Sequence, residues 1–163
     1  MKKLTKVRLI NWHYFANETI YIKNNTLITG QNATGKSTIV DAIAFVITAG
    51  DQIFNLAANE KSKRDLRGYV KCKLGIDNQE YLREGDVTGH IALEFYDETQ
   101  DSHFTVGTVI DAFGEVLPPK YLFYEVEEPI SESLFIDEEG RILSTMAFKK
   151  ARIAERIYPT RRE

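Results

Sequence analysis

The residues best suited to chemistry form one short string near the start of the chain, Gly-Gln-Asn-Ala-Thr-Gly-Lys-Ser-Thr at positions 30–38. This string matches the phosphate-binding pattern G-x-x-x-x-G-K-[ST] without a mismatch. Gly30 and Gly35 permit backbone angles that a Cβ atom disfavours, so the N–H groups of the loop can converge on one anion. Lys36 would contribute a positive charge to the β- and γ-phosphates, and the Ser37 hydroxyl would bind Mg²⁺. The pattern predicts a nucleotide site.

Two flanking elements must position this loop. Residues 25–29 are apolar and few, which is typical of a buried strand that leads into such a loop. Residues 37–48 follow a helical period, with a glycine stop at position 50 and an apolar face of Ile39, Ile43, Val46 and Ile47. A helix beginning at Lys36 would add unpaired N–H groups and the positive end of its dipole to the site. Asp41 lies one turn beyond Ser37, where it would either support the loop or face solvent.

An aromatic-rich turn, Asn-Trp-His-Tyr-Phe at 11–15, separates two further predicted strands at residues 4–12 and 19–22. In P-loop proteins such a turn can lie against the base of the nucleotide, where a flat ring offers stacking area at low entropic cost. The alternative is that Trp12 and Phe15 pack in the core. His13 and Tyr14 are therefore the candidates for nucleotide binding in this turn.

Composition sets the outer bounds. A chain of 163 residues with 43% hydrophobic content can bury one core, so we expect a single domain or part of a larger one. Cys72 is the one cysteine, which excludes an internal disulfide, fits a reducing cytoplasm and favours a small apolar residue in a strand. The charged first eight residues are not a secretory signal, and no apolar run is long enough to cross a bilayer. We expect a cytoplasmic protein without a membrane partner.

The net charge of −3 conceals a strong segregation along the chain. Residues 1–76 carry 12 basic and 5 acidic side chains, residues 77–139 carry 2 and 17, and residues 140–163 carry 7 and 2. Such asymmetry hints at faces with different partners, although we interpret the acidic middle first as solvated strand surface. An acidic face does not bind nucleic acid. DNA would therefore have to contact the basic N-terminal portion or segments outside this chain.

Residues 51–68 break the regular pattern and form a basic irregular segment. It carries Lys61, Lys63, Arg64 and Arg67, offset by Glu60 and Asp65. This segment is the best candidate for a surface that contacts phosphates, either from DNA or from a nucleotide held by a neighbouring subunit. The segment has no aromatic residues interleaved with its basic ones, so charge alone supports this interpretation.

The second half of the chain is predicted to be almost wholly β. Strands are expected at residues 69–74, 89–96, 103–110, 121–126 and 133–136, and consecutive strands without intervening helices should pair antiparallel. Ser144 is expected to cap a last helix over 145–157, with an apolar face of Met146, Ile153 and Ile157. The predicted fold class is α/β, with a P-loop β-α unit joined to an antiparallel β-sheet. We expect one lobe over 1–157 and a tail at 158–163. The lobe would consist of the P-loop unit at 1–50, the basic segment at 51–68, the antiparallel β region at 69–143 and a helix at 144–157.

Hydrolysis requires a carboxylate after a buried strand to complete the Mg²⁺ shell, and a second acidic or amide group to orient the attacking water. Two strings imitate this pair, Asp97-Glu98 and Asp137-Glu138. The first ends a strand that contains Glu94 and alternates as a half-exposed strand does. The second runs directly into Glu-Gly-Arg, which is typical of a hairpin turn. We interpret both strings as turn acids, so the catalytic carboxylates would lie outside this chain.

The strings at 7–15, 30–37 and 38–43 resemble the opening of ATPase heads of the SMC (structural maintenance of chromosomes) and Rad50 type. Trp12, the string Phe-Asn-x-Ala-Ala at 54–58 and Arg-Gly-Tyr-Val at 67–70 are most similar to MukB-like and Wadjet-type condensin ATPases. The resemblance covers residues 4 to about 96. It implies an ABC-like head built from N- and C-terminal lobes around a long coiled coil. Two such heads close on two ATP molecules to act on DNA.

The resemblance also implies a role for each matching position. ATP would be bound by Gly30, Gln31, Asn32, Ala33, Thr34, Gly35, Lys36, Ser37 and Thr38, with Ser37 also on Mg²⁺. Lys36 and Arg67 are the expected catalytic residues, and Arg67 stands where these heads often have an arginine that senses DNA or the partner's nucleotide. Ala33-Thr34 replaces the usual Gly-Ser, which should tune affinity. No glutamine stands at the expected Q-loop position, and no signature motif, Walker B pair or heptad repeat appears.

We therefore expect an N-terminal lobe of an SMC-like ATPase, as a piece of a longer or split protein. It would bind ATP and Mg²⁺ and hydrolyse ATP after pairing with a C-terminal lobe and forming a head-to-head homodimer, with DNA as a partner of the full assembly. Two alternatives stay open. One is a stand-alone nucleotide kinase, against which the antiparallel region argues because such enzymes repeat β-α units. The other is a nucleotide-sensing module that binds without hydrolysis.

Overall fold

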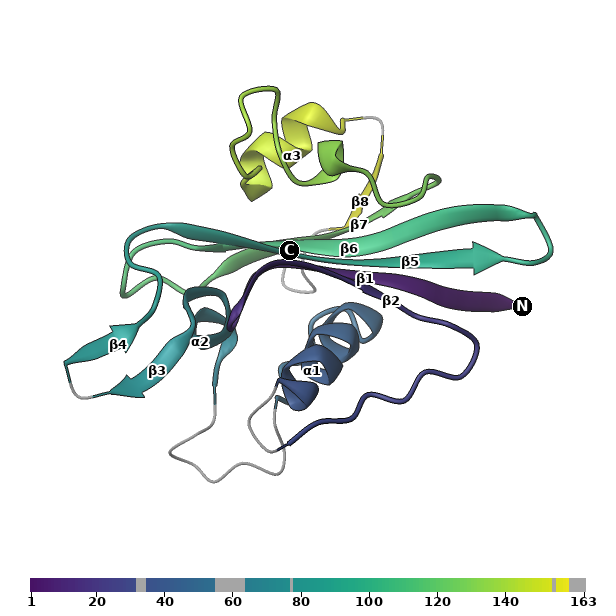
Figure 1. Ribbon diagram of the computed structural model, residues 1–163. Coiled ribbons are helices and arrows are strands. Elements are labelled where there is room, and N and C mark those ends of the chain that lie inside the picture. The colour runs from purple at the N-terminus through teal and green to yellow at the C-terminus, as the bar shows by residue number, and fades with distance from the viewer. Residues whose placement is uncertain (32–34, 55–63, 77, 154, 159–163) are drawn as a thin grey trace.

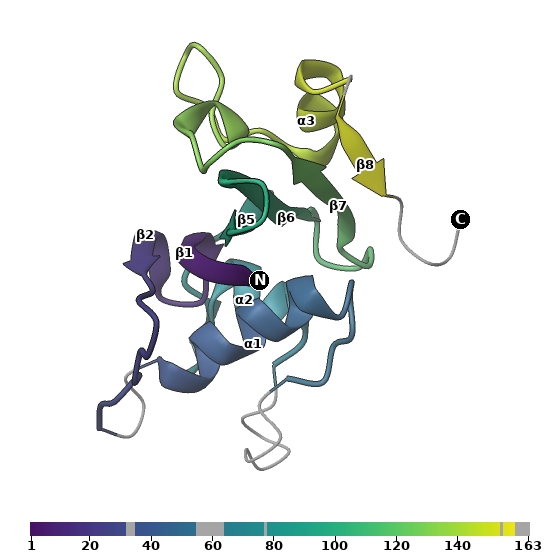
Figure 2. The same ribbon diagram turned by 90° about the vertical axis from the view of Figure 1, so that its right-hand side faces the viewer.

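The computed structural model describes residues 1–31, 35–54, 64–76, 78–153 and 155–158. A six-stranded sheet forms the middle layer, with helices α1 (Lys36–Ile47) and α2 (Leu66–Lys71) on one face. The opposite face carries a 3-10 turn, η2 (Glu132–Leu134), and helix α3 (Thr145–Ala151) (Figure 1). Figure 2 shows the same three layers from the side, with α1 and α3 on opposite faces of the sheet.

All neighbouring strands of the sheet pair antiparallel, in the order β2-β1-β5-β6-β7-β8. Their bounds are β1 Lys2–Trp12, β2 Phe15–Tyr21, β5 Val87–Asp97, β6 Ser102–Ala112, β7 Lys120–Val126 and β8 Arg156–Tyr158. A separate hairpin joins β3 (Lys73–Ile76) to β4 (Gln79–Tyr81). The α/β class and the antiparallel sheet are confirmed, and helix α1 follows the loop as expected, but the strand of the expected P-loop β-α unit is absent from the described residues. The strands β1, β5, β6 and β7 lie where strands were predicted, but residues 87–94 of β5 are all buried, whereas a half-exposed strand was expected there.

Each face of the sheet has its own core, because successive side chains of a strand point to opposite faces. Leu9 and Trp12 of β1 and Leu93 of β5 pack under α1 and α2, together with Phe45 and Tyr69 of those helices. The second core lies under η2 and α3 and contains Ile10, Ala92, Val109, Leu122, Tyr124, Val126, Leu134, Phe135, Leu143 and Phe148. The sheet therefore fixes α1, and with it the phosphate loop, from one face alone.

The strand expected at residues 25–29 is wrong. In the described part of the chain, residues 22–30 join no strand, and Leu27 is 83% exposed. A strand needs a partner for its backbone N–H and C=O groups. Both positions beside β1 are taken by β2 and β5, and after the Ile22 N–H, which donates to the Thr5 carbonyl, residues 23–30 pair with no strand of the described chain.

The strand expected at residues 69–74 begins instead as helix α2. The side chain of Asp65 accepts a hydrogen bond from the Gly68 N–H, which caps a helix at this point. Leu66, Tyr69 and Val70 are then buried at helical spacing. Cys72 is buried as expected, but it is the left-handed C-cap of α2 rather than a strand residue.

Two further expectations are wrong, and a third is right in part. Residues 133–136 form no strand, because Leu134 and Phe135 are adjacent and both buried, which a 3-10 turn permits and a half-buried strand does not. Helix α3 ends at Ala151, earlier than expected, because residues 156–158 pair with β7 as β8. The helix buries Phe148, whereas Met146 and Ile153 of the expected apolar face are exposed. On α1, Ile39, Ile43 and Val46 pack against the core as expected, but Ile47 is exposed. The helix also buries Thr38, Asp41, Ala42 and Phe45.

Candidate nucleotide-binding site

The described part of the phosphate loop consists of Gly30, Gln31 and residues 35–38, and positions 32–34 lie outside the described residues. Gly35 is the N-cap of α1 and has φ +93°, a left-handed angle that residues with a Cβ rarely adopt. A Cβ on Gly35 would also lie 3.1 Å from Cζ of Phe15. The second glycine of the motif is therefore required both by the backbone angle and by the ring packed beneath it.

The amino end of α1 is arranged for an anion. The N-cap, Gly35, has no side chain, and no side chain of the described residues caps the helix, so the N–H groups of Lys36, Ser37 and Thr38 have no acceptor within the helix. The Lys36 ammonium folds over the loop and donates hydrogen bonds to the carbonyl oxygens of Gly30 and Gln31, the latter at 2.8 Å. Ser37 is exposed on the same turn. A convergent set of N–H groups, a lysine and an accessible hydroxyl can bind a phosphate chain with its divalent cation.

Two aromatic residues of the 11–15 turn support the loop from below. Trp12 is fully buried, and its indole N–H donates to the Thr38 carbonyl oxygen at 2.9 Å. Phe15 pairs with Trp12 across the β1–β2 hairpin and lies under Gly35. The alternative that Trp12 packs in the core is thus confirmed. Both rings also contact the loop and its helix.

Asp41 is buried, which rules out the exposed alternative. Its side chain is 8% exposed and accepts a hydrogen bond from the Tyr69 hydroxyl of α2. Burial, and then the bond to Asp41, raise the pKa of Tyr69 well above its usual value, so the phenol keeps its proton. The Tyr69 ring stacks on Trp12 with centroids 4.3 Å apart and planes 4° apart. The sequence indicated no role for Tyr69 in the loop.

The two candidates at the hairpin tip differ in environment. His13 is buried, with a left-handed backbone at φ 53°. Its backbone N–H donates to the Tyr69 carbonyl oxygen at 2.6 Å. Burial lowers the pKa of His13 to about 4, helped by the positive charges of Arg64 and Arg83, so the ring is neutral at pH 7. Tyr14 is 63% exposed. Contact of either ring with a nucleotide stays a prediction.

Arg67 does not lie free on a basic surface. It is 7% exposed and donates to the carbonyl oxygens of Gly114 and Leu117 in the β6–β7 connection. A role in sensing DNA or a partner's nucleotide stays a prediction, and it would require these bonds to open. Lys61, Lys63 and positions 55–58 lie outside the described residues.

The two acidic strings occupy turns, as expected. Asp97 ends β5 and accepts from the Thr99 N–H at 2.8 Å. Asp137 accepts from the N–H groups of Glu139 and Arg141, and the Arg141 N–H bond in particular lowers the pKa of its carboxyl. Glu94 is buried and accepts from Thr5, Lys6 and the Ile130 N–H. Each of these three carboxylates is committed to its own local structure.

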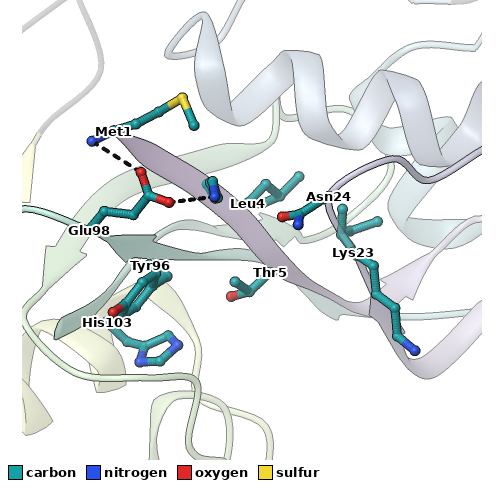
Figure 3. Close-up of a pocket in the computed structure, with 10 residues that line it drawn as sticks. Met1, Leu4, Thr5, Lys23, Asn24, Tyr96, Glu98 and His103 are labelled. Atoms are coloured by element: carbon teal, nitrogen blue, oxygen red, sulfur yellow. Dashed lines mark ion pairs between the residues drawn. The ribbon is translucent and has the colours of Figure 1, made fainter. Parts of the chain in front are cut away.

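A groove of about 850 Å³ lies at another edge of the sheet. Met1, Leu4, Thr5, Lys23, Asn24 and His103 line it, and Glu98 pairs there with Lys3 and the terminal amine (Figure 3). No residue of the phosphate loop borders this groove. Among the described residues, no cluster of three His, Cys, Asp or Glu side chains is arranged to hold a metal. None of the described helices has the length and apolarity that a membrane span requires.

Comparison with known proteins agrees with the geometry of the loop. Residues 4–61 match the family model of the P-loop containing region of AAA domain. The matched range takes in β1, β2, the phosphate loop and α1, and it supports a P-loop NTPase domain. No curated protein matches the chain. The class that the loop and this match define is a P-loop nucleotide-binding domain with a mostly antiparallel sheet.

Proposed function

We propose that this chain is the ATP-binding N-terminal lobe of an SMC-like ATPase that acts on DNA. The lobe binds ATP with Mg²⁺ and hydrolyses it once a C-terminal lobe and a second head complete the site. One observation carries the nucleotide-binding part of the proposal. The first turn of α1 carries Lys36 and the Ser37 hydroxyl together with N–H groups that have no acceptor within the helix, and Gly35 before it has the left-handed conformation that the loop requires.

The residues present fit ATP and Mg²⁺. Lys36 and the first-turn N–H groups would hold the phosphates, and Ser37 would hold the cation. When bound, Mg²⁺ neutralises negative charge on the phosphate oxygens. The protein contributes orientation: Phe15, Trp12 and Tyr69 fix the loop and the first turns of α1 from the core side.

Exposed apolar residues around the loop favour a partner lobe. On the outer face of α1, Val40 is 55% and Ile47 63% exposed, and Leu27 in the segment before the loop is 83% exposed. Residues 23–30 have no strand partner in the described chain. A second lobe that pairs with this segment and covers the outer face of α1 would satisfy both features.

A nucleotide kinase is disfavoured because its architecture repeats parallel β-α units, whereas every pair in this sheet is antiparallel. A nucleotide-sensing module is the second candidate. It is favoured by the positions of Asp97, the last residue of β5, and Asp137, in a turn, because each carboxylate accepts hydrogen bonds from backbone N–H groups a few residues along the chain. The described residues therefore offer no carboxylate pair of the expected kind for hydrolysis.

The test combines this chain with the segment or chain that supplies the C-terminal lobe. ATP turnover is measured with and without the added lobe, with and without DNA, and for wild type beside Lys36→Ala. Turnover that requires both the lobe and Lys36, and that DNA increases, supports the proposed ATPase. Tight ATP binding without turnover in any combination supports the sensing module instead and contradicts the proposed hydrolysis.

A further inference from the structure

Two buried side chains tie the helix of the phosphate loop to the core. Trp12 of β1 donates its indole N–H to the carbonyl oxygen of Thr38, the residue after Ser37. Tyr69 of α2 donates its hydroxyl to the carboxylate of Asp41, one turn further along α1. Trp12 and Tyr69 are fully buried, and Thr38 and Asp41 are 5% and 8% exposed. Both bonds are shielded from water. In such a buried setting, a donor or acceptor that loses its partner is costly.

The two donors form a single unit. Their rings stack in parallel, and the ring of Phe54 meets both edge-on, with centroids 5.9 Å from Trp12 and 4.9 Å from Tyr69. The Tyr69 carbonyl also accepts the N–H of His13, the residue next to Trp12. A displacement of one ring therefore displaces the other. The unit contacts α1 at two points, Thr38 and Asp41, which lie on the buried side of the helix.

The position of α1 decides the geometry of the site. Its first turn supplies the N–H groups and the Ser37 hydroxyl, and misplacement of such groups by about 1 Å is expensive in phosphate chemistry. The outer side of the helix offers little restraint, because Val40 and Ile47 are exposed there. The inner contacts must therefore hold the helix in place.

We propose that Tyr69 and Trp12 are positioning residues for the nucleotide and Mg²⁺ site, with Tyr69 acting through Asp41 and Trp12 acting through the Thr38 carbonyl. This inference rests on the proposed nucleotide binding at Lys36 and Ser37. It assigns to α2, a short helix with no residue in the loop, a part in setting affinity for the metal–nucleotide complex.

The decisive variant is Tyr69→Phe, which keeps the stacked ring and removes the hydroxyl. We expect the dissociation constant for ATP with Mg²⁺ to rise roughly three- to tenfold, the effect of one lost buried hydrogen bond. Affinity for ATP in EDTA should change less, because misplacement of Ser37 weakens the cation contact. The matched control is Tyr124→Phe on the opposite face of the sheet. Tyr124 is also buried, and its hydroxyl has no hydrogen-bond partner among the described residues, so its removal should leave both affinities unchanged.

A double-mutant cycle tests the route through Asp41. Asp41→Ala removes the acceptor of the Tyr69 hydroxyl, so Asp41→Ala and Tyr69→Phe combined should weaken binding no more than Asp41→Ala alone. Strictly additive effects, or a Tyr69→Phe variant that binds like wild type while Lys36→Ala does not, overturn the positioning role and leave the proposed function intact. A wild-type chain that binds no ATP overturns both. Thermal unfolding of each variant shows that affinities are compared between folded proteins.

Discussion

Replacing Gly35 by alanine tests the geometry of the phosphate loop through stability as well as binding. The new Cβ meets two costs. Holding a residue with a side chain at φ +93° costs about 1–2 kcal/mol, and the Cβ would also lie 3.1 Å from Cζ of Phe15. Phe15 is half-buried against the core of α1, so its ring must shift to make room. This crowding adds about 1 kcal/mol to the strain.

The matched control is Gly85→Ala, because Gly85 also has a positive φ, +71°, but a Cβ there meets no atom within 4 Å. Urea unfolding should show Gly35→Ala losing about 1 kcal/mol more stability than Gly85→Ala. Adding Phe15→Leu to Gly35→Ala should recover part of that difference. ATP titration should show weaker binding for Gly35→Ala alone. Equal unfolding free energies for the two alanine variants, with unchanged ATP affinity, would refute the described loop.

Three other expectations concern the domain as a whole. Gly107→Ala should cost about 3 kcal/mol in urea unfolding, because its Cβ would lie 2.7 Å from the Ile91 carbonyl oxygen and against the Tyr124 hydroxyl; a change below 0.5 kcal/mol would contradict this packing. Burial lowers the pKa of both His13 and His90 to about 4 in the folded chain, from an ordinary value near 6.5. The unfolded chain therefore binds more protons than the folded chain between pH 4 and 6.5. The free energy of unfolding should be highest above pH 6.5 and should fall by about 1.4 kcal/mol per pH unit for each histidine as the pH drops towards 4. His90→Gln should remove one proton from that slope between pH 6.5 and 5, and an unchanged slope would argue against a neutral buried His90. Arg67→Met should lower the free energy of unfolding by about 2 kcal/mol, because it removes the hydrogen bonds to the Gly114 and Leu117 carbonyl oxygens, and Arg67→Lys should restore little of this loss. An unchanged free energy of unfolding in Arg67→Met would show that these two bonds do not form.

Local patterns predicted the features that depend on local chemistry. The phosphate loop followed from its motif, because few other arrangements need two glycines and a lysine at that spacing. Strands β5 and β6 and the N-cap at Ser144 were also predicted, and Ser144 does accept the Ala147 N–H. In each case the signal lies within a dozen residues.

The errors have a different physical origin, since they depend on partners distant in the chain. Residues 25–29 have the composition of a strand but no neighbour to pair with. Tyr69 and Val70 favour strands by propensity, yet the Asp65 cap and the burial of Leu66 turn them into a helix. Asp41 carries no sequence sign that it is buried, because its partner, Tyr69, lies 28 residues away. Arg67 likewise bonds to carbonyls that the fold brings from 47 and 50 residues away.

Isothermal titration with ATP and Mg²⁺ tests the central claim most directly, on wild type, Lys36→Ala and Lys23→Ala. Lys23 is an exposed lysine outside the loop, so its removal matches the change in charge. Wild type and Lys23→Ala should bind ATP with equal affinity, and Lys36→Ala should bind at least about tenfold more weakly, because it loses a charge-assisted contact to the phosphates. Equal affinity of Lys36→Ala and wild type, or no binding by wild type, would contradict a nucleotide site at this loop.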